Sequence, residues 1–379
     1  MEKVVETYLS TSQAAAHLGV SVSTIYRMVD QGVLLPIKTP GGQRRFGVSD
    51  LDAYKNKSHT INAPQNPRLY QKTLFDDDFA GVKEGDAEST AEKTEEEKSV
   101  VDPRNKLNDL TGKEWLPETK SFFFQKGLGA RHPHAQIERQ HPAPFSFQDV
   151  GRLIAFFTKG GQYVLDPFGG VGSTAKACAL LGRKCTSIEL SDQWHELSLK
   201  RLETEVGSGE SENHTFIRGD CREILHGMDE DTFDFMVTSP PYWSILNKKA
   251  DHKVKKERLT DNLATNYSDD DKDLGNIENY EVFLEELVKI FLQCGKVIKT
   301  GKYMAIVVSD FRHKSEFVSF HSDLIQRLNK SRVGMESKLS LQGVKVLLQN
   351  HKSLLPYGYP YAYVENIHHQ YILLFRKIT

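Results

Sequence analysis

Residues 163–174 constrain the fold of this chain more than any other segment. An apolar run from Tyr163 to Leu165 ends in Asp166, and the glycine-rich stretch Pro-Phe-Gly-Gly-Val-Gly follows. Ser173 and Thr174 then open a helical pattern that continues to Leu181. A strand, a glycine turn and a helix in this order are typical of parallel α/β sheets, where glycines let the backbone approach a ligand at the carboxyl edge. The loop alone does not identify that ligand, because dinucleotide sites carry a similar pattern.

Three further strands are expected after this loop, and each ends in polar residues. The segment 184–190 ends near Glu189, and the segment 214–221 ends near Asp220. The apolar run 233–238 is followed by Ser-Pro-Pro-Tyr at 239–242. Because the carboxyl ends of parallel strands meet at one edge of a sheet, we expect these groups to share one site. A carboxylate at the position of Glu189 is suited to ribose hydroxyls.

Two of these motifs together resemble a known family. Asp166-Pro-Phe-Gly-Gly-Val-Gly172 and Thr238-Ser-Pro-Pro-Tyr-Trp243 look like the S-adenosylmethionine-dependent DNA methyltransferases that modify N4 of cytosine or N6 of adenine. The likeness covers residues 104–379 and includes a similar segment at 141–145, a fifth strand at 302–310 and a last strand at 370–377. It implies an α/β fold with a Rossmann-like methyltransferase sheet, mostly parallel with a C-terminal antiparallel hairpin.

The resemblance also implies S-adenosyl-L-methionine as the cofactor. It assigns the methionine end of the cofactor to five residues of the glycine loop: Asp166, Phe168, Gly169, Gly170 and Gly172. Glu189 would accept hydrogen bonds from both ribose hydroxyls, and Asp220 would read the adenine amino group. Carboxylates at strand ends are often helix caps, so that alternative stays open for Asp220. The chemistry requires no metal.

In the same family, the tetrapeptide at 239–242 is catalytic. By that resemblance, the side chain of Ser239 and the carbonyl of Pro240 would accept the hydrogens of the target amine, and Pro241 would stiffen the loop. Tyr242 would stack on the base, which must be flipped out of the duplex. Serine at the first position favours N4 of cytosine, with N6 of adenine as the alternative.

The N-terminal residues 7–55 form a separate patterned segment. A short helix at 13–18, a turn at Gly19 and a second helix at 24–31 match the helix-turn-helix motif, and a Gly-tipped hairpin at 38–46 follows. This segment resembles the MerR/excisionase-like winged helix-turn-helix family. The resemblance implies a set of DNA-facing residues: Ser23, Thr24, Tyr26, Arg27, Arg44 and Arg45. The alternative is a small helical module that binds no DNA.

Charge is distributed unevenly along the chain. Residues 56–103 are polar, and within 76–98 ten acidic residues face three lysines, a local net charge of −7. We therefore predict an acidic flexible linker at 56–103, which leaves +5 for the rest of a chain whose total is −2. The loop after the tetrapeptide, 244–277, carries Lys248 and Lys249 and is a candidate DNA contact. Double-stranded DNA is the expected partner, with a cognate restriction nuclease as a further candidate.

Composition excludes secreted, membrane-spanning and disulfide-rich proteins. The four cysteines form no CxxC pair, and no apolar stretch among the 379 residues is long enough to span a bilayer. A cytoplasmic protein is expected. Two rival functions remain: a helix-turn-helix regulator with a catalytically silent methyltransferase domain, and methylation of RNA or of a protein amide.

Overall fold

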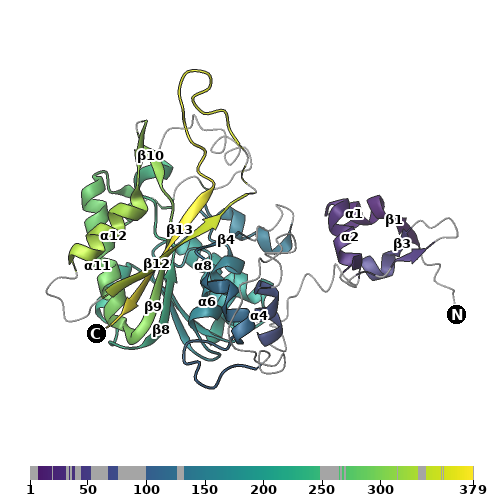
Figure 1. The fold of residues 1–379 in the computed structure, drawn as a ribbon, viewed down its shortest axis with the longest axis horizontal. Helices are drawn as coiled ribbons and strands as arrows, with labels where there is room; N and C mark the ends of the chain where they lie inside the picture. The colour runs from purple at the N-terminus through teal and green to yellow at the C-terminus, as the bar shows by residue number, and fades with distance from the viewer. Residues whose placement is uncertain are drawn as a thin grey trace, which may run out of the picture.

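The computed structural model describes most of the chain. The described residues are 7–18, 20–30, 34, 36–38, 44–52, 67–75, 100–125, 132–247, 264, 267, 268, 270–313, 315–331, 339–350, 352 and 354–378. Lys248 and Lys249 lie outside them. The described residues form an N-terminal unit and a larger C-terminal unit, and each is described by itself (Figure 1).

The N-terminal unit is a helix-turn-helix with a small antiparallel sheet. Its elements are β1 (Tyr8–Ser10), α1 (Thr11–Leu18), α2 (Val22–Asp30), β2 (Ile37–Lys38) and β3 (Arg44–Gly47), with a helical turn at 48–52. α1 begins two residues earlier than expected because Ser10 and Gln13 form a reciprocal cap: each backbone N–H donates to the other side chain, at 2.9 and 3.3 Å. Apolar residues from both helices and β3 form a common core: Ala14, Ala15, Ile25, Met28, Leu34, Phe46 and Leu51.

The C-terminal unit is built on one eight-stranded sheet in the order β4-β12-β13-β9-β8-β5-β6-β7. These strands are β4 (Phe122–Phe124), β5 (Tyr163–Asp166), β6 (Lys184–Glu189), β7 (Thr215–Arg218), β8 (Phe233–Thr238), β9 (Ile298–Val308), β12 (Leu339–Leu348) and β13 (His369–Lys377). β5 to β9 pair in parallel, whereas β13 runs antiparallel to both β9 and β12. The expected sheet with a C-terminal antiparallel hairpin is therefore confirmed, and β4 adds an edge strand that the sequence did not predict.

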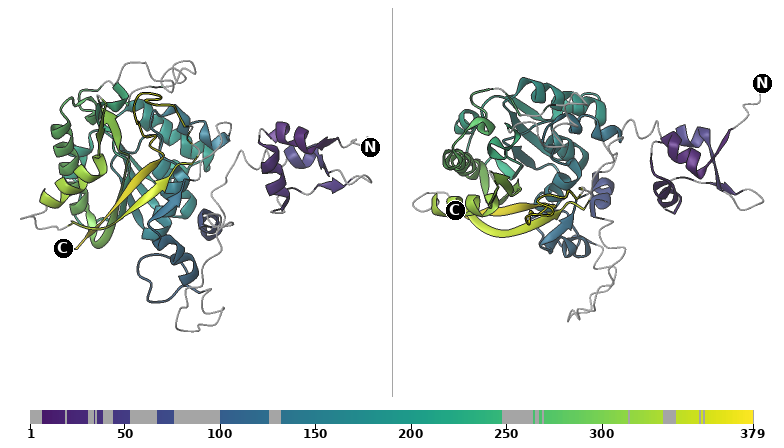
Figure 2. Two further views of the ribbon diagram at one scale, coloured as in Figure 1. Left: turned by 45° about the horizontal axis from the view of Figure 1, so that its top comes forward. Right: turned by 90° about the horizontal axis from the view of Figure 1, so that it is seen from above.

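Helices cover both faces of this sheet (Figures 1 and 2). One face packs on α6 (Phe147–Phe157), α7 (Ser173–Leu181) and α8 (Asp192–Glu205), and the other on α9 (Cys221–His226), α11 (Tyr280–Val297) and α12 (Phe320–Ser331). Neighbouring strand residues serve opposite cores: Val164 belongs to the first and Leu165 to the second. This double burial explains the continuous apolar runs of β5 and β8.

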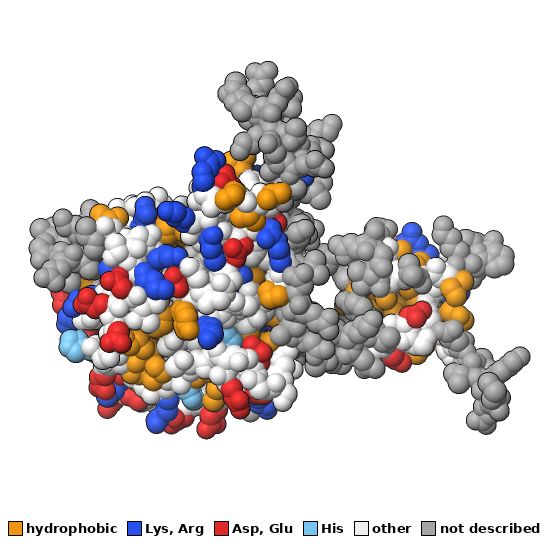
Figure 3. All heavy atoms as spheres, turned by 90° about the horizontal axis from the view of Figure 1, so that it is seen from below, with side chains coloured by type: hydrophobic (Ala, Val, Ile, Leu, Met, Phe, Trp, Pro, Cys, Tyr) orange, Lys and Arg blue, Asp and Glu red, His pale blue; other side chains and the backbone are white. Residues whose placement is uncertain are grey.

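Smaller elements complete the unit. They are α5 (Gly112–Trp115), the hairpin β10 (Phe311–His313) and β11 (Glu316–Val318), and short 3-10 turns at Pro117–Thr119, Pro133–Ala135, Glu138–Gln140, Glu210–Asn213, Trp243–Asn247 and Leu274–Asn276. Within the described residues, none of the helices is both long and apolar enough to cross a membrane. Figure 3 looks at the molecule from the end away from the β12–β13 loop, and acidic and basic side chains are mixed across this face.

Part of the predicted linker is a helix packed on the C-terminal unit. α4 (Pro67–Phe75) contacts α6 and α7. Leu74 is buried, and its Cδ1 lies against Gly151, where an added Cβ would be 3.3 Å away. Arg183 donates to the side chain of Gln71 at 3.4 Å. These few apolar and polar contacts hold the helix, although the segment around it lacks an apolar period.

Candidate active site

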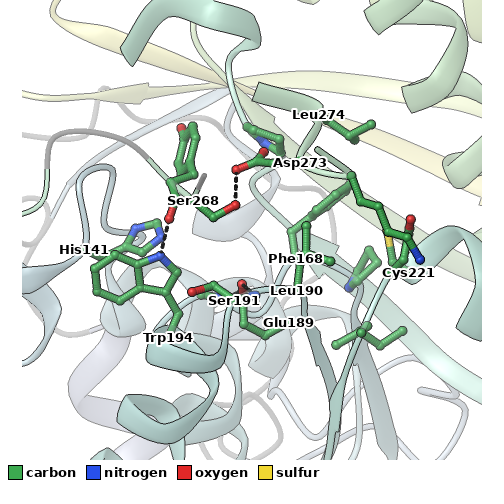
Figure 4. A pocket seen from close by; sticks show the side chains of 18 of the residues that line it. His141, Phe168, Glu189, Leu190, Ser191, Trp194, Cys221, Ser268, Asp273 and Leu274 are labelled. Carbon is green, nitrogen blue, oxygen red and sulfur yellow. Dashed lines mark hydrogen bonds between the residues drawn. The ribbon is translucent and has the colours of Figure 1, made fainter. Parts of the chain in front are cut away.

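A cleft opens at the carboxyl ends of β5, β6, β7 and β8 (Figure 4). Six of the predicted site residues line it: Phe168, Gly170, Glu189, Asp220, Ser239 and Pro241. The remaining lining residues are His141, Pro167, Ile188, Leu190, Ser191, Trp194, Gly219, Cys221, Tyr267, Ser268, Lys272, Asp273 and Leu274. The structure therefore brings residues of the glycine loop, both acidic strand ends and the Ser-Pro-Pro-Tyr tetrapeptide to one cavity.

Glu189 is held in place by the backbone on both sides. Its Oε2 accepts from the N–H of Gly170 at 2.8 Å, and its Oε1 accepts from the N–H of Ser191 at 2.8 Å. Burial raises the pKa of Glu189 from 4.5 to about 7, although both hydrogen bonds act in the opposite direction. Each oxygen keeps a lone pair for a hydroxyl donor.

Asp220 caps a helix and also lines the cleft. It is the N-cap of α9 and accepts from the N–H of Arg222 at 2.9 Å. The guanidinium of Arg222 also pairs with it, at 2.6 Å. Burial alone would raise the pKa of Asp220, but the hydrogen bonds from Arg222 outweigh it, so that the pKa lies below its ordinary value. Asp220 is therefore a helix cap, as the alternative expected, and it also lines the cleft.

Asp166 lies beneath the cleft and is not among its lining residues. It is 2% exposed and accepts from the hydroxyls of Thr174 at 2.5 Å and Thr238 at 2.6 Å, and from the N–H of Phe168 at 3.1 Å. Burial raises its pKa, and these three hydrogen bonds oppose that rise. Asp166 thus joins the glycine loop, the first turn of α7 and the end of β8. The structure gives it a positioning role.

The glycines of the loop are required mainly by packing within the chain. A Cβ on Gly169 would lie 2.0 Å from the hydroxyl of Ser187, and one on Gly172 would lie 2.9 Å from Ser198. Gly172 also has φ +74°, and Gly170 has φ +51°. Among the three, only Gly170 lines the cleft, where it faces His141. The sequence-based reason for these glycines, close approach of a ligand, therefore applies to Gly170 alone.

The tetrapeptide carries a hydrogen-bonded pair. Ser239 Oγ and Tyr242 Oη lie 3.1 Å apart, and Tyr242 Oη also accepts from the side chain of Gln370 at 2.9 Å. Ser239 and Pro241 line the cleft, whereas Pro240 is buried behind it. Burial raises the pKa of Tyr242, so the phenol is protonated at neutral pH. Gln370 is a site residue that sequence reasoning did not find.

A segment that sequence reasoning also missed crosses the cleft. The carbonyl of Tyr267 accepts from the indole of Trp194 at 2.8 Å, and Ser268 donates to Asp273 at 2.8 Å (Figure 4). Asp273 also accepts from the N–H of Gly275 at 2.8 Å, and burial raises its pKa. The sequence placed these residues in a loop expected to contact DNA, and no local pattern linked them to the cofactor motifs.

The predicted DNA-facing residues of the N-terminal unit are only partly placed together. Tyr26 on α2 is 46% exposed, and the guanidinium carbon of Arg44 lies 5.3 Å from its ring centroid. Arg45, next along β3, points to the opposite face of that strand. Thr24 Oγ1 lies 2.8 Å from Ser21 Oγ at the start of α2. Ser23 and Arg27 belong to α2, but their side chains are outside the described part of the structure.

Comparison with known proteins agrees with this arrangement. Residues 53–200 match a family model described as DNA methylase, of the N6/N4 type, and residues 8–59 match one described as helix-turn-helix domain. Over residues 53–200 the chain is therefore similar to DNA methylases. The sheet of the C-terminal unit, with parallel strands β5 to β9 and β13 reversed beside β9, agrees with the mostly parallel sheet and antiparallel hairpin that the two motifs implied.

The curated relatives of the methylase domain are matched over short stretches. The type II methyltransferase M2.DpnII of Streptococcus pneumoniae is 36% identical over 66 residues, which are 17% of this chain and 25% of that protein. The orphan methyltransferase M.BamHII of Bacillus amyloliquefaciens is 35% identical over 71 residues, 19% of this chain and 27% of that protein. The chain thus spans about a quarter of the length of these relatives. Among solved structures, an O-methyltransferase from Thermotoga maritima covers 62% of this chain and 64% of its own at 15% identity, with a TM-score of 0.32, which is too low to argue from.

Proposed function

We propose that this protein transfers a methyl group from S-adenosylmethionine to the exocyclic amine of a flipped base in double-stranded DNA. One observation carries the proposal: Ser239 and Pro241 line the same cleft as Glu189 and Asp220. The residues proposed to bind the methyl donor and those proposed to bind the acceptor amine therefore face one another in a single cavity.

The cleft fits the proposed cofactor in charge and in hydrogen bonding. S-adenosylmethionine carries a sulfonium, an ammonium and a carboxylate and is a net cation. Three carboxylates and one lysine line this cavity: Glu189, Asp220, Asp273 and Lys272. Glu189 presents a remaining lone pair on each oxygen to the two ribose hydroxyls. Leu274 supplies apolar surface for the adenine, and Phe168 does so for the methionine end. When bound, the cofactor supplies an electrophilic methyl group.

The tetrapeptide orients the acceptor amine. An exocyclic amine of a base is a poor nucleophile because its lone pair is delocalised into the ring. Ser239 and the carbonyl of Pro240 accept its hydrogens and so favour the pyramidal nitrogen that attacks. The two prolines restrict the loop, so the acceptors are aimed before the base arrives, which is catalysis by positioning and electrostatics. The base reaches this depth only outside the stack.

We assign the acceptor to N4 of cytosine because a neutral serine stands first in the tetrapeptide. N6 of adenine is the alternative product. The helix-turn-helix supports duplex DNA over RNA or a protein amide as the substrate, with Tyr26 and Arg44 as its candidate contacts.

The test is incubation of the purified full chain with labelled S-adenosylmethionine and plasmid DNA, followed by mass analysis of the nucleosides. N4-methylcytosine supports the whole proposal, and N6-methyladenine corrects the base alone. Ser239→Ala and Tyr242→Ala are expected to abolish transfer, whereas Ser208→Ala at an exposed serine leaves it unchanged. A folded protein that binds the cofactor but methylates no DNA would refute the proposal and favour the silent regulator.

A further inference from the structure

The loop between β12 and β13 projects from the active-site edge of the sheet (Figure 1). We call its residues 354–366 the tyrosine arm. Three tyrosines of the arm are among the most exposed large side chains of the described residues: Tyr359 at 81%, Tyr361 at 94% and Tyr363 at 84%. Clusters of exposed apolar side chains often mark interaction sites, whereas single exposed apolar residues are ordinary.

The backbone of the arm is held by internal hydrogen bonds at its neck and at its tip. At its neck, the side chain of Asn366 accepts from the N–H of Leu355 at 2.9 Å and donates to the carbonyl of Leu355 at 2.8 Å. At its tip, the N–H groups of Tyr361 and Ala362 both donate to the carbonyl of Gly358 at 2.7 Å. Gly358 has φ +73°, and a Cβ there would lie 2.3 Å from the carbonyl oxygen of Ala362. The tyrosines are therefore presented on a tight turn whose backbone is already restrained, and each has only two side-chain torsions to fix on binding.

The arm begins and ends beside the catalytic tetrapeptide. At its foot, the N–H of Gln349 donates to the carbonyl of His368 at 2.8 Å. Two residues further along, Gln370 contacts the hydroxyl of Tyr242. The strands that flank the arm therefore meet beside the tetrapeptide, at the edge of the sheet where the cleft opens.

We propose that the tyrosine arm stacks on the bases that lose a neighbour when the target base is flipped; this rests on the proposed function. Of residues 354–366 only Glu365 is formally charged, so the arm is unsuited to phosphates. Aromatic side chains stack on any base, at about 1–3 kcal/mol per base. The arm thus stabilises the opened duplex, while charged residues elsewhere hold the backbone.

The test compares the wild type with the triple variant Tyr359→Ser, Tyr361→Ser, Tyr363→Ser in DNA binding measured by anisotropy at several salt concentrations. We expect affinity to fall at least about fivefold at every salt concentration, with an unchanged salt slope, because no phosphate contact is lost. Fluorescence of 2-aminopurine at the target position should fall as well, since fewer bases are flipped. Tyr163→Ser, at an exposed tyrosine on β5, is the matched control and should change neither signal.

Three results would overturn this assignment. Unchanged DNA affinity in the triple variant would exclude stacking by the arm. A changed oligomeric state in light scattering, with unchanged DNA binding, would make the arm a protein interface. If the wild type and the triple variant methylate DNA equally well, the stacking role of the arm is refuted and the proposed function stands. If the wild type methylates no DNA, the proposed function itself is refuted.

A second inference rests on a separate observation, a chain of three glutamine side chains that ends at Tyr242. It starts at Asp149 on α6, which is buried and accepts from the amide nitrogen of Gln125 at 2.9 Å. The amide oxygen of Gln125 accepts from Gln349 at 3.0 Å. The same nitrogen of Gln349 also donates to the amide oxygen of Gln370, at 3.2 Å. Gln370 in turn donates to Tyr242 Oη.

The donors and acceptors in this chain run in one direction from Asp149. The NH2 of Gln125 donates to Asp149, which leaves its amide oxygen to accept from Gln349. Gln370 likewise accepts from Gln349 with its amide oxygen, so its NH2 is left to donate to the phenol oxygen of Tyr242. The phenol hydrogen is then left to donate to Ser239, 3.1 Å away.

We infer that Gln370 and Asp149 are positioning residues that fix the hydroxyl hydrogen of Tyr242 on Ser239; this too rests on the proposed function. Ser239 keeps a lone pair for the target amine in this arrangement. Gln370→Glu would reverse the last bond, because a carboxylate accepts from the phenol and withdraws its hydrogen from Ser239.

The kinetic test measures methyl transfer by Gln370→Glu, with Gln342→Glu at an exposed position of β12 as the control for the same chemical change. We expect kcat to fall about tenfold or more, with KM for the cofactor within about twofold of the wild type. In a Tyr242→Phe background the same substitution should have almost no further effect, because the two residues act through one hydroxyl. Equal effects in both backgrounds, or a KM that rises as kcat falls, would overturn the inference. Absence of transfer by the wild type would instead refute the proposed function.

Discussion

Cofactor binding should depend on the protonation of Glu189, and the structure sets the size of the effect. Burial raises the pKa of this carboxyl to about 7. A cationic cofactor with two ribose hydroxyls favours the ionised form, so binding must release the proton. For a group that is ionised in the complex, the apparent affinity at pH 6 is about tenfold weaker than at pH 8.

The same shift makes the free protein less stable as the pH rises. The folded state binds this proton more tightly than the unfolded chain, so its contribution is fully present below pH 4.5 and is lost between 4.5 and about 7. At 1.36 kcal/mol per pKa unit, the loss is about 3 kcal/mol. Denaturant unfolding at pH 5 and pH 8 should show this difference in the wild type and lack it in Glu189→Gln.

Isothermal titration calorimetry with S-adenosylmethionine in buffers of different ionisation enthalpy tests the linkage. Nearly one proton should be released per cofactor bound at pH 6, and almost none at pH 8. Glu189→Gln should bind about 10- to 100-fold more weakly at pH 8, because a charge-assisted hydrogen bond is lost, and should be insensitive to pH. Asp273→Asn and the exposed Glu196→Gln should keep the pH dependence. A flat pH profile in the wild type, or an unchanged one in Glu189→Gln, would refute the reasoning.

Three further predictions follow from the loop beneath the cleft and from the N-terminal unit. Asp166→Asn leaves one of its buried hydroxyl partners without an acceptor and should lower the free energy of unfolding by about 2 kcal/mol, measured by urea denaturation; an unchanged midpoint would contradict the role given to Asp166. Gly172→Ala should cost about 1–3 kcal/mol in the same assay, because the new Cβ meets Ser198 at a positive φ, whereas a neutral effect would show that the loop relaxes freely. Arg44→Ala should weaken DNA binding by the full chain and reduce the salt slope by about one, while cofactor affinity stays constant in calorimetry; an unchanged slope would remove Arg44 from the DNA interface.

The fold could be predicted because local patterns determine it. The strand ends at Glu189 and Asp220 follow apolar runs, and the glycine loop marks the first turn from strand to helix. The mostly parallel sheet and its C-terminal antiparallel hairpin followed from the family resemblance, whereas the order of the strands was not predicted. These features depend on residues that are close together in the sequence, and the observed sheet agrees with them.

The rest of the site depends on contacts that leave no local trace. Gln370 meets Tyr242 across 128 positions, and Trp194 meets Tyr267 across 73. Neither pair has a spacing that a pattern could reveal. For Asp166 and Gly169, the pattern indicated the right loop but gave no sign that hydroxyls of the chain itself lie against both residues. The catalytic roles of the tetrapeptide and the DNA contacts stay predictions.

The docking of α4 shortens the connection between the two units. If the acidic segment 76–98 were the tether, the units could separate widely, but α4, which precedes this segment, packs on the C-terminal unit. The connection is then the 14 residues between Asp52 and Pro67. A fully extended chain of this length reaches about 50 Å, at roughly 3.5 Å per residue. On B-DNA that is a span of about 15 base pairs at roughly 3.4 Å each. A helix-turn-helix bound at its own sequence would therefore raise the local concentration of the catalytic unit over only one to two turns of the double helix, and methylation would be concentrated beside the sites that this unit occupies.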